Sequence, residues 1–324
     1  MRLSLKRFKH RYYTAFLILR LLLPVFITVI VLLLLASAGI LYSIIHPPKT
    51  LEVIDPSDYH MFASDFTWDG ARDDVMQGWY IRGSNQSPLI ILCHGYETNR
   101  SEVLSLASRL RDYGYNVFVY NQRGHGSSGQ KISSLGYYET EDLRQAIDKL
   151  IQRPEIDFNR IGMYGCSLGA YTALGASKGV PNVRVLVLDS VYPSISTFID
   201  LNVQRVVGFR TSLLNYLVTL LYRLYFRPPS DLVNGDFRPK DFQDKSILFI
   251  TGRDRNSALL AKETRRLYSE FTCRKEIINL ANSRESLLFG EDKRRYDQFL
   301  VDFFRKELPL IEEPVKIDLA NTPR

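Results

Sequence analysis

The pentapeptide Gly165-Cys166-Ser167-Leu168-Gly169 follows a short apolar run and precedes a stretch of helical character. A serine in a G-x-S-x-G sequence between a strand and a helix occupies a sharp, strained turn that exposes its hydroxyl. The two glycines remove the side chains that would clash where the strand and the helix cross. The pattern therefore predicts that Ser167 is a nucleophile at the edge of a sheet, although a serine here also suits a helix N-cap.

A serine nucleophile of this kind requires a general base, which is almost always a histidine placed later in the chain. The sequence contains five histidines, none of which follows Ser167: His10, His46, His60, His94 and His125. The sequence thus predicts a nucleophile that lacks its usual proton acceptor.

The chain beyond residue 58 alternates strand-like and helix-like segments, the pattern of a mostly parallel sheet. Eight segments have strand character: 61–68, 75–81, 89–93, 116–120, 160–164, 184–188, 246–250 and 275–280. Five have helical character: 102–113, 139–153, 167–178, 257–270 and 292–307. The first two strands alternate in polarity and favour an antiparallel edge, whereas the later ones are apolar enough for burial on both faces. We predict an α/β fold with an eight-stranded, mostly parallel sheet and helices on both faces.

Residues 192–243 form an insertion too long for an ordinary connection. Its leucines follow helical spacing, but Arg210, Asn215 and Arg223 interrupt them and argue against a second membrane span. We expect a helical cap, which either packs on the sheet, lines an apolar acyl pocket or rests against a membrane. Residues 308–324 are expected to form a loose tail.

The N-terminal region separates into a basic segment, 1–20, an uncharged apolar run, 21–45, and a Pro-containing linker, 46–58. The apolar run is long enough to cross a bilayer as a helix. Residues 1–50 hold seven of the 42 basic residues and no acidic one, so the rest of the chain is neutral, with 35 of each sign. A neutral body argues against a nucleic-acid-binding protein.

The charge distribution around the apolar run also predicts an orientation. Basic residues precede the run and acidic residues follow it, so the N-terminus is expected in the cytoplasm and the body outside, or in the lumen in a eukaryote. Ala36-Ser37-Ala38 fits a signal-peptidase site, which leaves a cleaved signal peptide as the alternative. The apolar character continues to Ile45, which favours a retained span.

The three cysteines, Cys93, Cys166 and Cys273, are too few and too scattered for a disulfide framework. We expect Cys93 and Cys166 to be buried thiols, with Cys166 pointing into the core and not acting as the nucleophile. Free thiols argue mildly against an oxidising compartment and against the external placement of the body.

Five motifs in order support a resemblance to a known family. They are Leu92-Cys93-His94-Gly95-Tyr96 with Asn99-Arg100, the glycine-rich stretch 121–129, Gly136-Tyr137-Tyr138-Glu139 with Asp142-Leu143, the Ser167 pentapeptide, and Gly252-Arg253-Asp254. From about 60 to 307 the chain resembles the α/β-hydrolases, and among them the bacterial membrane-anchored proteins of esterase-like or serine-aminopeptidase-like type. The resemblance implies a protein of the bacterial cell membrane.

The resemblance also implies roles for individual residues. Ser167 would be the nucleophile, and the backbone N–H groups of Tyr96 and Leu168 would form the oxyanion hole. Asp254 would be the acid of the triad, with Asp189 as the second candidate. His94, Gly95, Gly165 and Gly169 would support the local structure of these motifs. Both His94 and His125 either order their loops or, less expectedly, transfer protons.

The position at which similar proteins carry the triad histidine falls on Ser283, within one residue, and a hydroxyl is no proton acceptor at neutral pH. Two hypotheses remain open. The first is a serine hydrolase for ester, thioester or amide bonds in a small-molecule, lipid or acylated substrate, with a water or a relocated histidine (His60, His94 or His125) as base. The second is a catalytically silent protein that binds a ligand or partner. No histidine pair has metal-ligand spacing, and no cofactor is predicted.

Overall fold

The computed structural model describes residues 2–235, 237–253, 258–281 and 288–310. The chain divides into two compact units. One consists of Met1–Ile44 and Ile199–Arg227, and the other of Ile45–Phe198 and Pro228–Arg324. The predicted tail lies mostly outside the described residues.

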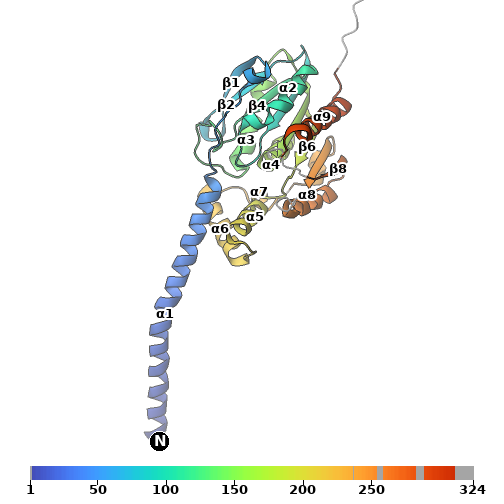
Figure 1. The fold of residues 1–324 in the computed structure, drawn as a ribbon. Helices are drawn as coiled ribbons and strands as arrows, with labels where there is room; N and C mark the ends of the chain where they lie inside the picture. Colours follow the sequence, from blue (N-terminus) through green and yellow to red (C-terminus); the bar gives the residue numbers. More distant parts are fainter. Residues whose placement is uncertain (1, 236, 254–257, 282–287, 311–324) are drawn as a thin grey trace, which may run out of the picture. The chain divides into compact units, whose positions relative to one another are not determined.

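The larger unit contains the eight-stranded sheet, in the order β1-β2-β4-β3-β5-β6-β7-β8 (Figure 1). The strands are β1 (Ala63–Asp69), β2 (Val75–Ile81), β3 (Ser87–Cys93), β4 (Asn116–Tyr120), β5 (Ile156–Cys166), β6 (Val183–Asp189), β7 (Ser246–Gly252) and β8 (Arg274–Leu280). β2 pairs antiparallel with both β1 and β4, and all the other pairs are parallel. The predicted α/β fold and its antiparallel edge are confirmed.

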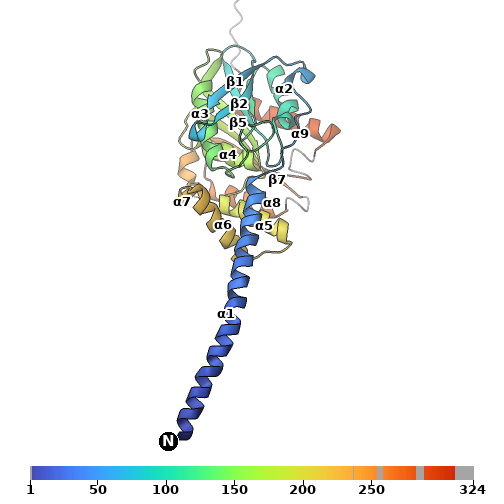
Figure 2. The ribbon, with the colours of Figure 1, turned by 90° about the vertical axis from the view of Figure 1, so that its left-hand side faces the viewer.

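Helices cover both faces of this sheet. The helices around it are α2 (Leu104–Asp112), α3 (Tyr137–Leu150), α4 (Leu168–Ser177), α8 (Ala258–Glu270) and α9 (Gly290–Glu307). α2 packs against α9, and α3 packs against α4. Figure 2 shows α3 and α4 on one face of the sheet and α2 and α9 on the other. Side chains of α2, α9 and the central strands share one buried apolar core, so the carboxyl ends of the parallel strands are held rigidly.

Three short elements differ from the simple pattern of strands and helices. The helix expected from residue 102 begins as a 3-10 turn, η3 (Arg100–Val103), because the Asn99 side chain accepts from the Ser101 N–H and turns the chain there. Two more 3-10 turns, η1 (Pro56–Tyr59) and η2 (Ala71–Asp73), lie before β1 and between β1 and β2.

The segment before β1 is attached to loops of the larger unit. Glu52 accepts hydrogen bonds from Arg100 Nε at 3.0 Å and from the Ser127 N–H at 2.8 Å. Asn99 Nδ2 donates to Thr50 Oγ1 at 2.9 Å. These contacts fasten the expected linker to the loops after β3 and β4.

The smaller unit is helical. It holds most of α1 (Arg2–Ile45) and of α5 (Ile195–Val207), together with α6 (Ser212–Phe226). Within α1, Phe16–Ile45 is the one segment of the described chain that is long and apolar enough to be a candidate membrane span, and a signal sequence has the same properties. The rest of the predicted cap, α7 (Ser230–Asn234) and η4 (Pro239–Phe242), belongs to the larger unit.

Candidate active site

Ser167 occupies the sharp turn between β5 and α4. Its backbone angles are φ 51° and ψ −110°, a conformation that is costly for a residue with a side chain. The surroundings hold it there, because the Ser167 N–H donates to the Asp189 carbonyl at 2.9 Å and the Ser167 carbonyl accepts from the Tyr171 N–H at 3.0 Å. The turn expected from the pentapeptide is therefore present, and Ser167 is positioned by β6 as well as by its own helix.

The two glycines of the pentapeptide are required by close backbone contacts. A Cβ on Gly165 would lie 2.3 Å from the Gly169 carbonyl oxygen. A Cβ on Gly169 would lie 2.3 Å from the Cys93 carbonyl oxygen and 2.4 Å from that of His94. No side chain fits at either distance, so these glycines let the end of β3 and the start of α4 touch directly.

Two backbone segments meet beside Ser167. Leu168 is the first residue of α4, where helix geometry leaves the N–H without an acceptor in the helix. The loop after β3 lies against the turn, since a Cβ on Gly95 would be 3.7 Å from both the carbonyl oxygen and the Sγ of Cys166. Tyr96 follows Gly95 in that loop. The loop that carries Tyr96 therefore lies against the turn that leads into Leu168.

The aromatic ring of Tyr96 packs edge-on against two other rings, 5.5 Å from His125 and 5.0 Å from Phe198. Ser167 itself is only 3% exposed. The surroundings therefore cover nearly all of Ser167.

His94 is engaged by the backbone at both ring nitrogens. Its Nδ1 donates to the Gly95 carbonyl at 2.8 Å, and its Nε2 accepts from the Gln122 N–H at 3.0 Å. Burial of the ring, with the neighbouring His125 as a smaller cause, lowers the pKa of His94 to about 3. His94 is thus a neutral side chain that joins the loop after β3 to the turn after β4.

His125 is held by a hydrogen bond within its own turn. Its Nδ1 donates to the Arg123 carbonyl at 2.9 Å, and its buried Nε2 has no hydrogen-bond partner among the residues that the structure describes. Burial lowers the pKa of His125. Of the other candidate bases, His60 is exposed at the end of η1. Within the described part of the chain, neither His94 nor His125 is hydrogen-bonded to the Ser167 hydroxyl.

Asp254 and Ser283 both lie outside the described residues. The strands that precede them are described: β7 and β8 pair in parallel, with Gly252 beside Leu280, and the Arg253 N–H donates to the Leu280 carbonyl at 3.0 Å. The strand ends that precede the two positions are therefore neighbours, at the same edge of the sheet as the carboxyl end of β5.

Asp189, the second candidate for the acid, ends β6 and is fully buried. Its carboxylate accepts from Ser190 Oγ at 2.8 Å and from the Tyr296 hydroxyl at 2.6 Å. The Tyr296 hydroxyl is also 3.2 Å from that of Tyr164. No local sequence pattern predicts the contact between Asp189 and Tyr296, because 107 residues separate them.

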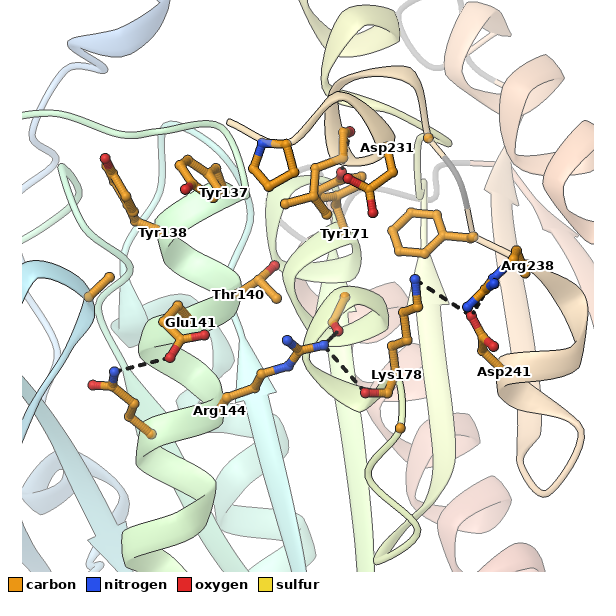
Figure 3. A pocket seen from close by; sticks show the side chains of 18 of the residues that line it. Tyr137, Tyr138, Thr140, Glu141, Arg144, Tyr171, Lys178, Asp231, Arg238 and Asp241 are labelled. Carbon is orange, nitrogen blue, oxygen red and sulfur yellow. Dashed lines mark hydrogen bonds and ion pairs between the residues drawn. The ribbon is translucent and has the colours of Figure 1, made fainter. Parts of the chain in front are cut away.

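A cavity of about 820 Å³ lies elsewhere on the larger unit, between α3, α4 and residues 229–241 (Figure 3). Among the described residues, none of those predicted to form the site lines this cavity. Three of its basic side chains have partners, since Arg144 donates to the Gly175 carbonyl at 2.8 Å, and Lys178 and Arg238 both pair with Asp241. The cavity is therefore distinct from the serine turn.

Sequence comparison relates the centre of the chain to hydrolases. Residues 84–234, somewhat less than half of the chain, match the family model Hydrolase_4, serine aminopeptidase S33. YqkD of Bacillus subtilis (strain 168), an uncharacterized protein, is 35% identical over 99 residues, 31% of this chain and 32% of YqkD. YfhR of Escherichia coli (strain K12), also uncharacterized, is 30% identical over 157 residues, 45% of this chain and 52% of YfhR. The matches thus span a third to a half of these relatives.

Structural comparison covers more of the chain. The Pyrococcus furiosus esterase Pf2001 has a TM-score of 0.63 at 19% identity, covering 82% of this chain and 99% of the esterase. The Pyrococcus horikoshii acylaminoacyl peptidase has a TM-score of 0.56 at 16% identity, covering 79% of this chain and 43% of the peptidase. These likenesses show the shared fold. Together with the family match and the glycine-lined serine turn, they show that the chain has the α/β-hydrolase fold.

Proposed function

We propose that the protein is a membrane-anchored serine hydrolase that cleaves ester, thioester or amide bonds through Ser167, with an impaired or unconventional general base. The observation that carries this proposal is the positive φ of Ser167, maintained where β5, β6 and the loop after β3 meet. Strained residues of this kind persist where the surroundings over-determine them, most often at functional sites. The match to serine aminopeptidases supports the same reaction class.

In this proposal each residue has a defined task. The Ser167 hydroxyl attacks the acyl carbon, and the N–H groups of Tyr96 and Leu168 stabilise the negative charge that develops on the carbonyl oxygen. Asp254 occupies the acid position and Ser283 the position of the histidine. A water held between them would accept the serine proton. Without an imidazole the rate is expected to fall by about 10⁴ to 10⁶, because the base no longer takes up that proton efficiently.

A catalytically silent binding protein is the second candidate. Two observations favour it: the imidazoles of His94 and His125 are not hydrogen-bonded to Ser167, and Ser167 is 3% exposed. Such a protein would keep the turn as part of its fold and use the surrounding surface to bind a ligand.

Labelling with a fluorophosphonate probe tests whether the serine is activated. The native chain should become labelled, and the Ser167→Ala variant should not. Ser194→Ala provides a matched control, since Ser194 is a buried serine of the same unit outside the proposed site. An unlabelled native chain, with both variants folded, would favour the silent candidate.

Restoring the histidine tests the rest of the site. Ser283→His should increase hydrolysis of a short-chain aryl ester by orders of magnitude if the acid position and the oxyanion hole are intact. Ser283→Ala controls for loss of the hydroxyl, and Ser167→Ala combined with Ser283→His shows whether any gain passes through Ser167. No gain in a folded Ser283→His protein would mean that position 283 or Asp254 is wrongly assigned.

The proposed location is a membrane, crossed by the candidate span with the N-terminus in the cytoplasm and the larger unit outside. Substrates would be small acylated molecules or lipids. Protease treatment of intact cells checks the orientation, since cleavage of the larger unit requires that it lie outside.

A further inference from the structure

Helix α6 carries apolar side chains on two sides. Val218, Tyr222 and Phe226 recur every four residues and are buried. Apolar residues also face outward at helical spacing and are between 37% and 64% exposed: Leu213, Tyr216, Leu220 and Leu224. A surface helix of a water-soluble protein normally has a polar outer side. The outward row of α6 therefore suits an apolar surrounding.

The turn before α6 extends this apolar surface. Phe209 is 62% exposed and Val206 is 58% exposed, at the point where α5 ends and α6 has not yet begun. With the outward row of α6, they form a contiguous stretch of sequence in which bulky apolar side chains meet solvent. Exposed apolar surfaces of this kind mark binding to a protein or a membrane.

The charges of the same segment have one sign. Residues 201–230 contain no Asp or Glu, and their charged residues are Arg205, Arg210, Arg223 and Arg227. Arg210 forms an ion pair with Asp200 at 2.9 Å, just outside this stretch. Apolar side chains accompanied by arginines and tyrosines are the composition of a helix that lies at the surface of an anionic bilayer.

The exposed length of α1 fits a location of the α6 segment at the surface of the bilayer. From Phe16 to Ala36 nearly every side chain of α1 is exposed, and at 1.5 Å per residue this run measures about 30 Å, the thickness of the hydrocarbon core. The buried side chains of α1 begin only at Ser37. α1 up to Ile44 and Ile199–Arg227 form one compact unit, and in Figures 1 and 2 α5 and α6 lie beside the C-terminal part of α1.

We infer that Val206–Phe226 is a second membrane contact, an interfacial hairpin whose outward apolar row enters the anionic leaflet beside the end of α1. The inference rests on the membrane anchoring proposed above. The hairpin lies in the bilayer surface and does not cross it. The alternative to the membrane is a second copy of the chain that covers the same apolar row.

Fluorescent labelling of the full-length chain in lipid vesicles tests this inference. The native thiols are buried, so Tyr216→Cys and Leu224→Cys direct an environment-sensitive dye to the outward row. Phe158→Cys is the matched control, because Phe158 is an exposed aromatic residue of the larger unit. The vesicles contain phosphatidylcholine and phosphatidylglycerol, with or without a lipid that carries a quencher on its acyl chain.

The expected result is severalfold stronger quenching by the quencher lipid at 216 and 224 than at 158, with weaker quenching by aqueous iodide. Quenching at 216 and 224 that matches position 158 would overturn the inference. Protection from both the lipid quencher and iodide would also overturn it, since protein would then cover the row. Flotation of the chain with the vesicles is scored separately, so that failure of anchoring by α1 is distinguished from failure of the hairpin to insert.

Discussion

The Tyr296 hydroxyl donates a 2.6 Å hydrogen bond to the carboxylate of Asp189, and the carbonyl of the same aspartate accepts the N–H of Ser167. Helix α9 is thereby connected through the end of β6 to the serine turn. The backbone of Ser167 depends on this connection, because a strained residue keeps its conformation only where its neighbours are held.

Replacing Tyr296 by phenylalanine removes that donor and leaves a buried carboxylate oxygen with one partner fewer. The loss should destabilise the fold by about 1–3 kcal/mol, measured as a lower urea midpoint in detergent. Tyr225→Phe is the control, since Tyr225 is 59% exposed. Equal midpoints for the two variants would show that the bond to Asp189 contributes nothing to stability.

The contact between β3 and α4 predicts different effects for alanine at two glycines of the site, Gly169 and Gly95. Gly169→Ala brings a Cβ to 2.3 Å from the Cys93 carbonyl, so the loop must move. We expect a loss of about 1–3 kcal/mol in stability, typical of overpacking, and loss of fluorophosphonate labelling. A Cβ on Gly95 would meet nothing closer than 3.7 Å, so Gly95→Ala should keep native stability and native labelling. Labelling of Gly169→Ala at the native rate would contradict the tight contact.

Most of the fold followed from local sequence signals. The strands from β3 onward are short apolar runs bounded by turns, and their positions were predicted to within a few residues because burial on both faces leaves little choice of side chain. The start of β5 was missed. It begins at Ile156, five residues before the apolar run, and its pairing with β6 shifts register between Ile161 and Gly162. Such an irregular beginning has no apolar signature.

The site was predictable only in part. The Ser167 turn is local, so five residues were sufficient to predict its conformation. The roles assigned to Asp254 and Ser283 remain predictions, since both positions lie outside the described residues. The bond between Tyr296 and Asp189 joins segments far apart in the sequence, and only the packing of α9 reveals it.

Two aspartates beside Arg123 differ in burial and should differ in their contribution to stability. Asp142 is 1% exposed at its side chain and accepts from Arg123 Nε and Nη2, both at 2.7 Å. Asp74 is 39% exposed and accepts from Nη1 at 3.0 Å. Asp142→Asn should cost about 3–5 kcal/mol, because it leaves the buried guanidinium with only the more exposed Asp74 as counter-charge. Asp74→Asn should cost about 0–1 kcal/mol, as for an exposed ion pair. Urea unfolding in detergent compares the stabilities of the two variants. Similar losses of stability would contradict the difference expected from burial.

The burial of His94 predicts a dependence of stability on pH. Its pKa is lowered from 6.5 to about 3 in the folded chain, chiefly by burial. Between these values the unfolded chain binds a proton that the folded chain does not. The stabilisation is therefore complete above pH 6.5 and is lost as the pH falls toward 3, by up to about 1.4 kcal/mol per pH unit. His125 contributes with the same sign, since burial lowers its pKa as well.

Replacing His94 by glutamine separates this titration from the structural role of the ring. His94→Gln should lower stability at neutral pH, because the hydrogen bonds to Gly95 and Gln122 are disturbed. The unfolding free energy of the variant should then fall less steeply than that of the native chain between pH 6.5 and about 4. The difference in slope should correspond to nearly one bound proton. His60→Gln, at an exposed histidine, controls for removal of an imidazole. The measurement is urea unfolding across that pH range. A slope unchanged in His94→Gln would mean that His94 takes up a proton in the folded chain, which would contradict a neutral ring between Gly95 and Gln122.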